Sequence, residues 1–154
     1  MPSEKRNIKY RGFYALLIGV LLALLSMSSG YAAELEVKDA RLRALPGDLP
    51  AAGYFTLDNT SDKSVVLVGA QSDAFGMVEM HRSTNEDGMA GMESISQLEV
   101  APGKSLEFAP KGYHLMLMQP KQPLSVGDEV SVELEFEDDR RLSVDFEVVS
   151  PASM

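Results

Sequence analysis

Short runs of alternating apolar and polar residues, each followed by turn-forming residues, make up the chain from residue 35 onward, and no segment there keeps a helical period. The clearest two runs are 130–136 and 142–148, which flank the polar turn at 138–141. A period of two is typical of strands with one buried face and one solvated face. These two runs therefore predict an antiparallel hairpin.

Further runs of the same kind predict about seven to nine short strands in all. They lie at 35–42, 53–58, 65–68, 77–81, 106–109 and 113–118. Short strands separated by frequent turns are typical of a β-sandwich or a small Greek-key barrel, so we expect one all-β domain. Segment 84–92 has two glycines and two methionines in a polar context, and we expect a flexible loop or a hairpin there.

The first 33 residues have the parts of an export signal. Four basic residues precede the apolar run 15–25, and small residues follow it, with Ala32 and Ala33 at the exit. We expect a signal peptide at 1–33, cleaved near Ala32 or Ala33, and a folded domain at 34–154. The alternative is an uncleaved N-terminal membrane anchor, although the apolar run is short for a membrane span.

The charge and the missing cysteines exclude several kinds of partner and site. The net charge of −9 argues against nucleic acid and against anionic membrane surfaces. The absence of cysteine removes disulfides, thiolate ligands and the attachment point for a lipoprotein-type lipid. We expect a monomer exported to the periplasm, with a core that supplies its stability.

Both histidines and six of the nine methionines lie between Met77 and Met118. Most methionines in strands fill cores, and alternation places Met80 in the core. Met89 and Met92 lie in a polar segment without apolar neighbours that would explain them as core residues. Exposed methionines are open to oxidation in an exported protein, so their presence indicates a use.

Alternation also predicts which side chains share a face. In the strand at 113–118, His114 and Met116 point to one side, and Leu115 and Leu117 point to the core. His81 shares its face with Glu79, a residue that does not belong in a core. We therefore expect both histidines to point outward and to form an exposed site with nearby methionines.

The donor types select the metal. Two imidazoles and two thioethers suit Cu(I), whereas Zn²⁺ prefers thiolate, imidazole and carboxylate, and Ca²⁺ needs oxygen. A blue-copper electron-transfer centre requires a cysteine thiolate, which is absent. An exposed site with neutral, labile ligands favours transfer of the ion over catalysis on it.

The spacing of these residues resembles the signature of the PCu(A)C family of periplasmic copper chaperones. In that family a His, ten residues, a Met and twenty-one residues precede His-x-Met, and this chain has His81, Met92, His114 and Met116 at those positions. The resemblance covers roughly residues 35–149, including flanks such as 52–57 and 112–118. Arg82 stands where many members have a methionine.

The resemblance implies a cupredoxin-like Greek-key β-sandwich that binds one Cu(I) per chain through these four residues. Met89 and Met118 are candidates for additional ligands. It further implies delivery of copper toward the binuclear copper centre of cytochrome c oxidase subunit II, beside a Sco-type thiol protein, without enzymatic activity. The alternatives are a copper-tolerance or storage module, a copper enzyme, for which two histidines give poor support, and a structural β-sandwich with no metal role.

Overall fold

The computed structural model describes residues 34–153, and the expected signal peptide at 1–33 lies outside the described residues. Within them, ten strands are followed by a short 3₁₀ turn at Pro151–Ser153. The strands are β1 (Leu35–Arg43), β2 (Ala51–Asn59), β3 (Val65–Gln71), β4 (Phe75–Glu86), β5 (Met89–Ser94), β6 (Leu98–Val100), β7 (Ser105–Phe108), β8 (Tyr113–Pro120), β9 (Glu129–Phe136) and β10 (Arg141–Val149). Across 34–153 there is no helix long and apolar enough to span a membrane. The prediction of an all-β domain is confirmed.

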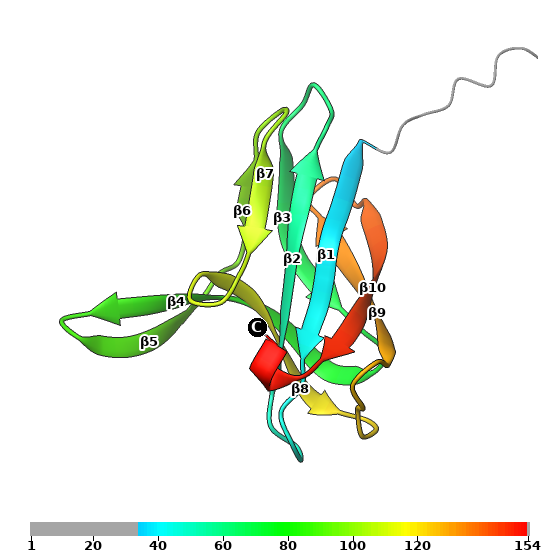
Figure 1. Cartoon of the computed structure of the whole chain (residues 1–154). Helices are drawn as coiled ribbons and strands as arrows, with labels where there is room; N and C mark the ends of the chain where they lie inside the picture. The colour runs from blue at the N-terminus through cyan, green and yellow to red at the C-terminus, as the bar shows by residue number, and fades with distance from the viewer. Residues whose placement is uncertain (1–33, 154) are drawn as a thin grey trace, which may run out of the picture. The chain divides into compact units, whose positions relative to one another are not determined.

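All ten strands belong to one hydrogen-bonded sheet, in the order β5-β4-β8-β7-β2-β1-β10-β9-β3-β6, with a further pairing of β8 to β2. The predicted hairpin is present as β9 and β10, where Arg141 lies opposite Glu135. β1 and β10 run parallel, whereas β1 and β2 run antiparallel. Figure 1 shows β1 and β2 side by side, and β4 and β5 extending away from the other strands.

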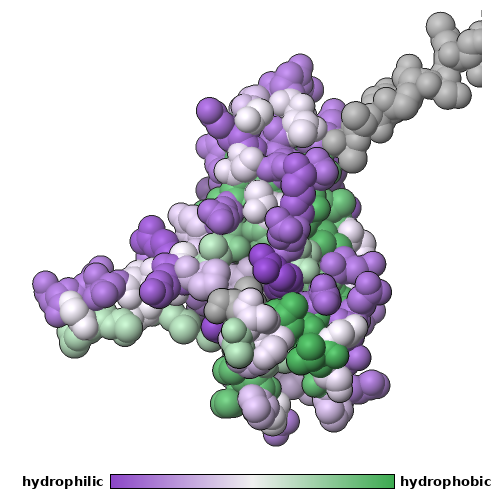
Figure 2. All heavy atoms as spheres, in the orientation of Figure 1, coloured by the Kyte–Doolittle hydropathy of each residue, from purple (hydrophilic) through white to green (hydrophobic). Residues whose placement is uncertain are grey.

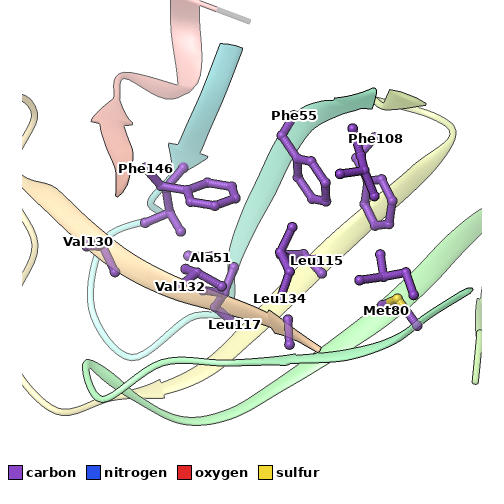
Figure 3. Packing of buried hydrophobic residues seen from close by; sticks show 14 of the residues in the cluster. Ala51, Phe55, Met80, Phe108, Leu115, Leu117, Val130, Val132, Leu134 and Phe146 are labelled. Atoms are coloured by element: carbon purple, nitrogen blue, oxygen red, sulfur yellow. The ribbon is translucent and has the colours of Figure 1, made fainter. Parts of the chain in front are cut away.

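The sheet bends so that its two portions face each other across an apolar core. Figure 3 shows side chains of β2 and β8 pointing toward those of β9, among them Phe55, Leu115 and Leu134. The ring of Phe55 stacks on Phe108 at 4.4 Å between centroids and meets the edge of Phe146 at 5.7 Å. Such contacts add to the burial of apolar area that stabilises a domain of this size.

Gly53 lets β2 and β8 approach closely beneath the candidate site. It lies opposite Leu115 in the β2–β8 pairing. A Cβ at residue 53 would lie 3.2 Å from the Cβ of Leu115 and 3.3 Å from the Cε1 of Phe146. A larger residue would therefore push β8 away from β2, which explains a glycine in the middle of a strand.

Segment 84–92, for which a loop or a hairpin was predicted, is a hairpin. Asp87 and Gly88 form its two-residue turn with φ angles of 52° and 79°, and Glu86 lies opposite Met89. Positive φ at both positions is the requirement of a type I′ turn, which suits the twist of two antiparallel strands. The hairpin of β4 and β5 forms the arm that projects in Figure 1.

Candidate metal centre

The pairing of β4 with β8 brings the two histidines together. His81 lies directly opposite His114 in the antiparallel register, and their ring centroids are 5.9 Å apart at an angle of 51°. Directly opposed residues of two antiparallel strands project from the same face of the sheet. Two residues from distant parts of the sequence thus place two imidazoles side by side.

The same register adds two thioethers on this face. Met116 lies two residues from His114 and opposite Glu79. Met92 of β5 lies opposite Ser83, which is two residues from His81 and therefore on its face. The four predicted ligands consequently belong to one face of three neighbouring strands.

A groove of about 860 Å³ opens beside this group. Met92, His114 and Met116 line it, together with Arg43 and Tyr54. His81 is not among its lining residues and lies at the edge of the group, against His114. Three of the four predicted residues therefore line one open groove.

The sequence predicts that both histidines point outward at an exposed site. The predicted face is correct, but the side chain of His81 is only 14% exposed, and the prediction fails most clearly at His114. His114 is only 5% exposed. The pairing of β2 with β8 places Tyr54 on the same face, and the guanidinium of Arg43 lies 5.7 Å from the centre of the Tyr54 ring. These two side chains come from β2 and β1, so the residue pattern within 113–118 does not reveal that they lie beside His114.

Each imidazole has one nitrogen held by oxygen. The Nε2–H of His81 donates to the Oε2 of Glu79 at 2.9 Å, because a carboxylate only accepts. The Nδ1–H of His114 donates to the carbonyl oxygen of Gly112 at 3.3 Å. A histidine that ligates a metal characteristically donates its other N–H to a carboxylate or a backbone carbonyl, which fixes the tautomer and the ring orientation.

The remaining nitrogens carry free lone pairs. The Nδ1 of His81 is buried and has no hydrogen-bond partner among the described residues. A buried polar atom without a partner is rare in folded proteins and calls for an explanation such as a bound ion. The orphaned Nδ1 of His81 and the Nε2 of His114 are the two nitrogen donors that a metal would use.

Burial keeps His114 in its ligating form. Loss of hydration lowers its pKa below the ordinary histidine value, and the charges of His81 and Arg43 lower it further, while the bond to the Gly112 carbonyl acts in the opposite direction. The lowered pKa leaves the imidazole of His114 neutral at neutral pH. A neutral imidazole is the form that binds a metal, so no proton must leave first.

The remaining methionines of the cluster separate into three groups. Met80 is 3% exposed and lies in the core, as alternation predicted. Met89 is 73% exposed and lies opposite Glu86, three residues from Met92 and therefore on the other face of the hairpin. Met118 shares the face of Met116 and lies opposite Met77.

Sequence reasoning missed two features of the centre. Glu79 orients His81 through the bond described above, and its position two residues before His81 on the same face is the signal that could have revealed it. Arg43 and Tyr54 flank His114 from distant strands, and no local pattern identifies them.

The surface beside the groove is partly apolar. Leu45, in the loop between β1 and β2, lines the groove and is 39% exposed. Figure 2 shows hydrophobic residues gathered at the end of the molecule below the β4–β5 arm, whereas the opposite end is hydrophilic. The candidate centre thus lies next to surface that water solvates poorly.

Comparisons with known proteins identify the family and the fold of the chain. A family model described as "LpqE-like: Putative lipoprotein LpqE-like" matches residues 35–148. An uncharacterised protein of Rickettsia prowazekii, RP573, is 35% identical over 101 residues, which are 65% of this chain and 56% of that protein. The chain thus matches little more than half the length of this relative.

Two solved structures are similar over most of the chain. The solution structure of CuI-DR1885 from Deinococcus radiodurans is 31% identical, with a TM-score of 0.62 over 82% of this chain and 85% of that one. A copper-bound PCuAC domain from PmoF2 is 24% identical, with a TM-score of 0.65 over 77% of this chain and 95% of that one. The cupredoxin-like fold expected from the sequence is confirmed.

Proposed function

Because the chain belongs to the LpqE-like family, the family of the PCu(A)C domains, we propose that it is a copper(I)-binding metallochaperone. The proposed ligands of its one ion are His81, Met92, His114 and Met116. The observation that carries the proposal is the pair of opposed imidazoles, each with one nitrogen held by oxygen and the other nitrogen free. The two similar structures are described as copper-bound, which supports the choice of metal.

The donor set suits an ion that is carried and released. Four neutral donors leave Cu(I) with a charge of +1, and soft thioethers favour the reduced ion over Cu(II). His114 is buried and fixed by its neighbours, whereas Met92 is 62% exposed on the projecting arm. We infer that a recipient displaces Met92 first, through the open groove, and that the histidines leave last.

The proposed setting is the periplasm. The basic and apolar leader at 1–33 supports export. The family description uses the word lipoprotein, but this sequence has no cysteine to accept a lipid, so a lipid anchor at a cysteine is not part of the proposal. Delivery toward the binuclear copper centre of cytochrome c oxidase subunit II, beside a Sco-type thiol protein, rests on the family resemblance.

Other roles for the same site are less well supported. Copper tolerance or storage uses the same ligands and differs only in the recipient, which a transfer assay with the oxidase subunit distinguishes. A copper enzyme is disfavoured because copper oxygenases use sites richer in histidine with open coordination. A structural role with no metal leaves the orphaned Nδ1 of His81 unexplained.

X-ray absorption on the copper-loaded protein tests the proposal directly. With one equivalent of Cu(I) added, we expect the ion to be bound by two nitrogen and two sulfur atoms, and we expect the loss of one sulfur in Met116→Leu. Met89→Leu is the matched control, since Met89 is exposed on the other face of the hairpin. Tight Cu(I) binding that survives both His114→Ala and Met116→Leu would contradict the proposal.

A further inference from the structure

Met77 and Met118 form a second pair of soft donors near the histidines. They lie directly opposite each other in the β4–β8 register, two pairs away from His81 and His114. Because residues two apart share a face, both thioethers project from the same side of the sheet as the two imidazoles. The four proposed ligands leave Met77 without a role, and its partner Met118 was predicted only as an additional ligand.

The three opposed pairs form a row that runs from the surface inward. Met77 is 45% exposed at one end. The side chain of Glu79, opposite Met116, is 43% exposed, and that of His81 is 14% exposed at the other end. β5 pairs with β4 only from His81 to Glu86, so the arm does not extend along Met77.

The position of the outer pair is fixed by its neighbours. Gly76 and Gln119 are the adjacent residues of β4 and β8, and a Cβ on Gly76 would lie 3.0 Å from the Cβ of Gln119. Phe75, next along, is 3% exposed and lies opposite Pro120. This close approach and this buried anchor hold β4 in register, so Met77 remains opposite Met118.

We propose that Met77 and Met118 form a second, weaker Cu(I) site, a transit site through which the ion reaches the histidine centre. Two thioethers bind Cu(I) less firmly than a set that includes imidazoles, so an ion there remains exchangeable. The inference rests on the proposed function for the identity of the ion and for the histidine centre as its destination.

Movement along the row is ligand exchange without redox chemistry. The bonds from copper to the sulfurs of Met77 and Met118 break as bonds to Met116 and then to His114 and His81 form. Copper remains Cu(I) throughout, and no proton or electron is transferred. The carboxylate of Glu79 lies between the two ends and attracts the cation at the middle of the path.

Metal titration with labelled methionine methyl groups tests the transit site on the full chain. The probe is Cu(I), added from a chelator and followed by NMR of the methionine methyl carbons. The first equivalent is expected to shift Met92 and Met116, and the second to shift Met77 and Met118. The variant with Met77→Leu and Met118→Leu is expected to bind one equivalent instead of two, because leucine fills a similar volume without a sulfur donor.

Two further variants separate this inference from the proposed function. Met89→Leu, the control, should still bind two equivalents. In His81→Ala with His114→Ala, the first equivalent should now shift Met77 and Met118, which would support Cu(I) binding by this pair whether or not the native protein holds copper at the histidines. The inference fails if the native protein binds a single equivalent, or if a second equivalent persists in the variant that lacks both Met77 and Met118.

Discussion

Asn59 and His114 are the two buried polar side chains of residues 34–153, and they differ in how completely their polar atoms are hydrogen-bonded. The Nδ2 of Asn59 donates to the carbonyl oxygens of Lys63 at 2.7 Å and Val100 at 2.9 Å. Its Oδ1 accepts from the hydroxyl of Ser61 at 2.7 Å. His114 has one long bond, to Gly112, and one nitrogen left over.

The difference separates a polar group that stabilises the fold from one reserved for a ligand. Both groups lose hydration on burial, and only Asn59 recovers the lost hydrogen bonds within the protein. His114 and its neighbour His81 leave a nitrogen lone pair each, which a soft cation can use. Substitution at Asn59 should therefore change stability, and substitution at His114 should change metal binding.

His114→Ala is the change with the largest expected effect. We expect Cu(I) affinity to fall by more than about a hundredfold, since loss of an outer hydrogen-bond partner alone typically lowers metal affinity 10–100-fold. The free energy of unfolding of the metal-free protein should change by less than about 2 kcal/mol. Competition with a Cu(I) chelator and urea unfolding measure the two quantities. A large loss of stability with unchanged Cu(I) affinity would mean that His114 stabilises the fold and does not bind the metal.

Asn59→Ala should give the complementary result. Removal of the amide takes the side-chain donor away from the buried carbonyl of Val100, whereas the carbonyl of Lys63 keeps the hydroxyl of Ser61 at 3.0 Å. We therefore expect a loss of about 2 kcal/mol of stability, of the order given by one buried group that loses its partner. Urea unfolding measures it. Cu(I) affinity of the folded variant should match that of the native protein, because Asn59 lies outside the groove residues. A loss below about 1 kcal/mol would mean that water replaces the lost donor.

Sequence alone predicts which residues would form the centre, and it does not predict how far they are buried. Alternation within 113–118 correctly placed Leu115 and Leu117 in the core and His114 on the other face. The donor types predict Cu(I), and the fold brings the four predicted residues to one face, while their binding of the ion stays a prediction. The register that sets His81 opposite His114 depends on a pairing between distant strands, which local patterns do not specify.

Two elements show why the rest escaped prediction. β6 (Leu98–Val100) has three residues, too few for a period to emerge. Arg43 and Tyr54 line the groove beside His114 because β1 and β2 extend the sheet next to β8. Such contacts join distant segments, so a pattern within one segment predicts more exposure than its side chains have in the fold.

Glu79→Gln tests whether the bond from the Nε2 of His81 to Glu79 strengthens metal binding by the Nδ1 of the same ring. Glutamine keeps a hydrogen-bond acceptor but loses the charge that makes the His81 imidazole a better donor, so we expect about a tenfold loss of Cu(I) affinity. Glu93→Gln is the matched control, because Glu93 is an exposed β5 carboxylate that binds Arg82 at 2.7 Å and does not contact either histidine. Equal losses in the two variants would indicate a general effect of charge.

Met89→Leu has the smallest expected effect. The arm carries one exposed methionine on each face, and only Met92 shares the face on which the unpaired imidazole nitrogens lie. If those nitrogens define the centre, Met89→Leu should leave Cu(I) affinity within about twofold of native, since leucine matches methionine in volume, while Met92→Leu should weaken it measurably. Chelator competition decides between them. Equal weakening in both variants would mean that the arm supplies thioethers without regard to face, and the register would then not define the ligand set.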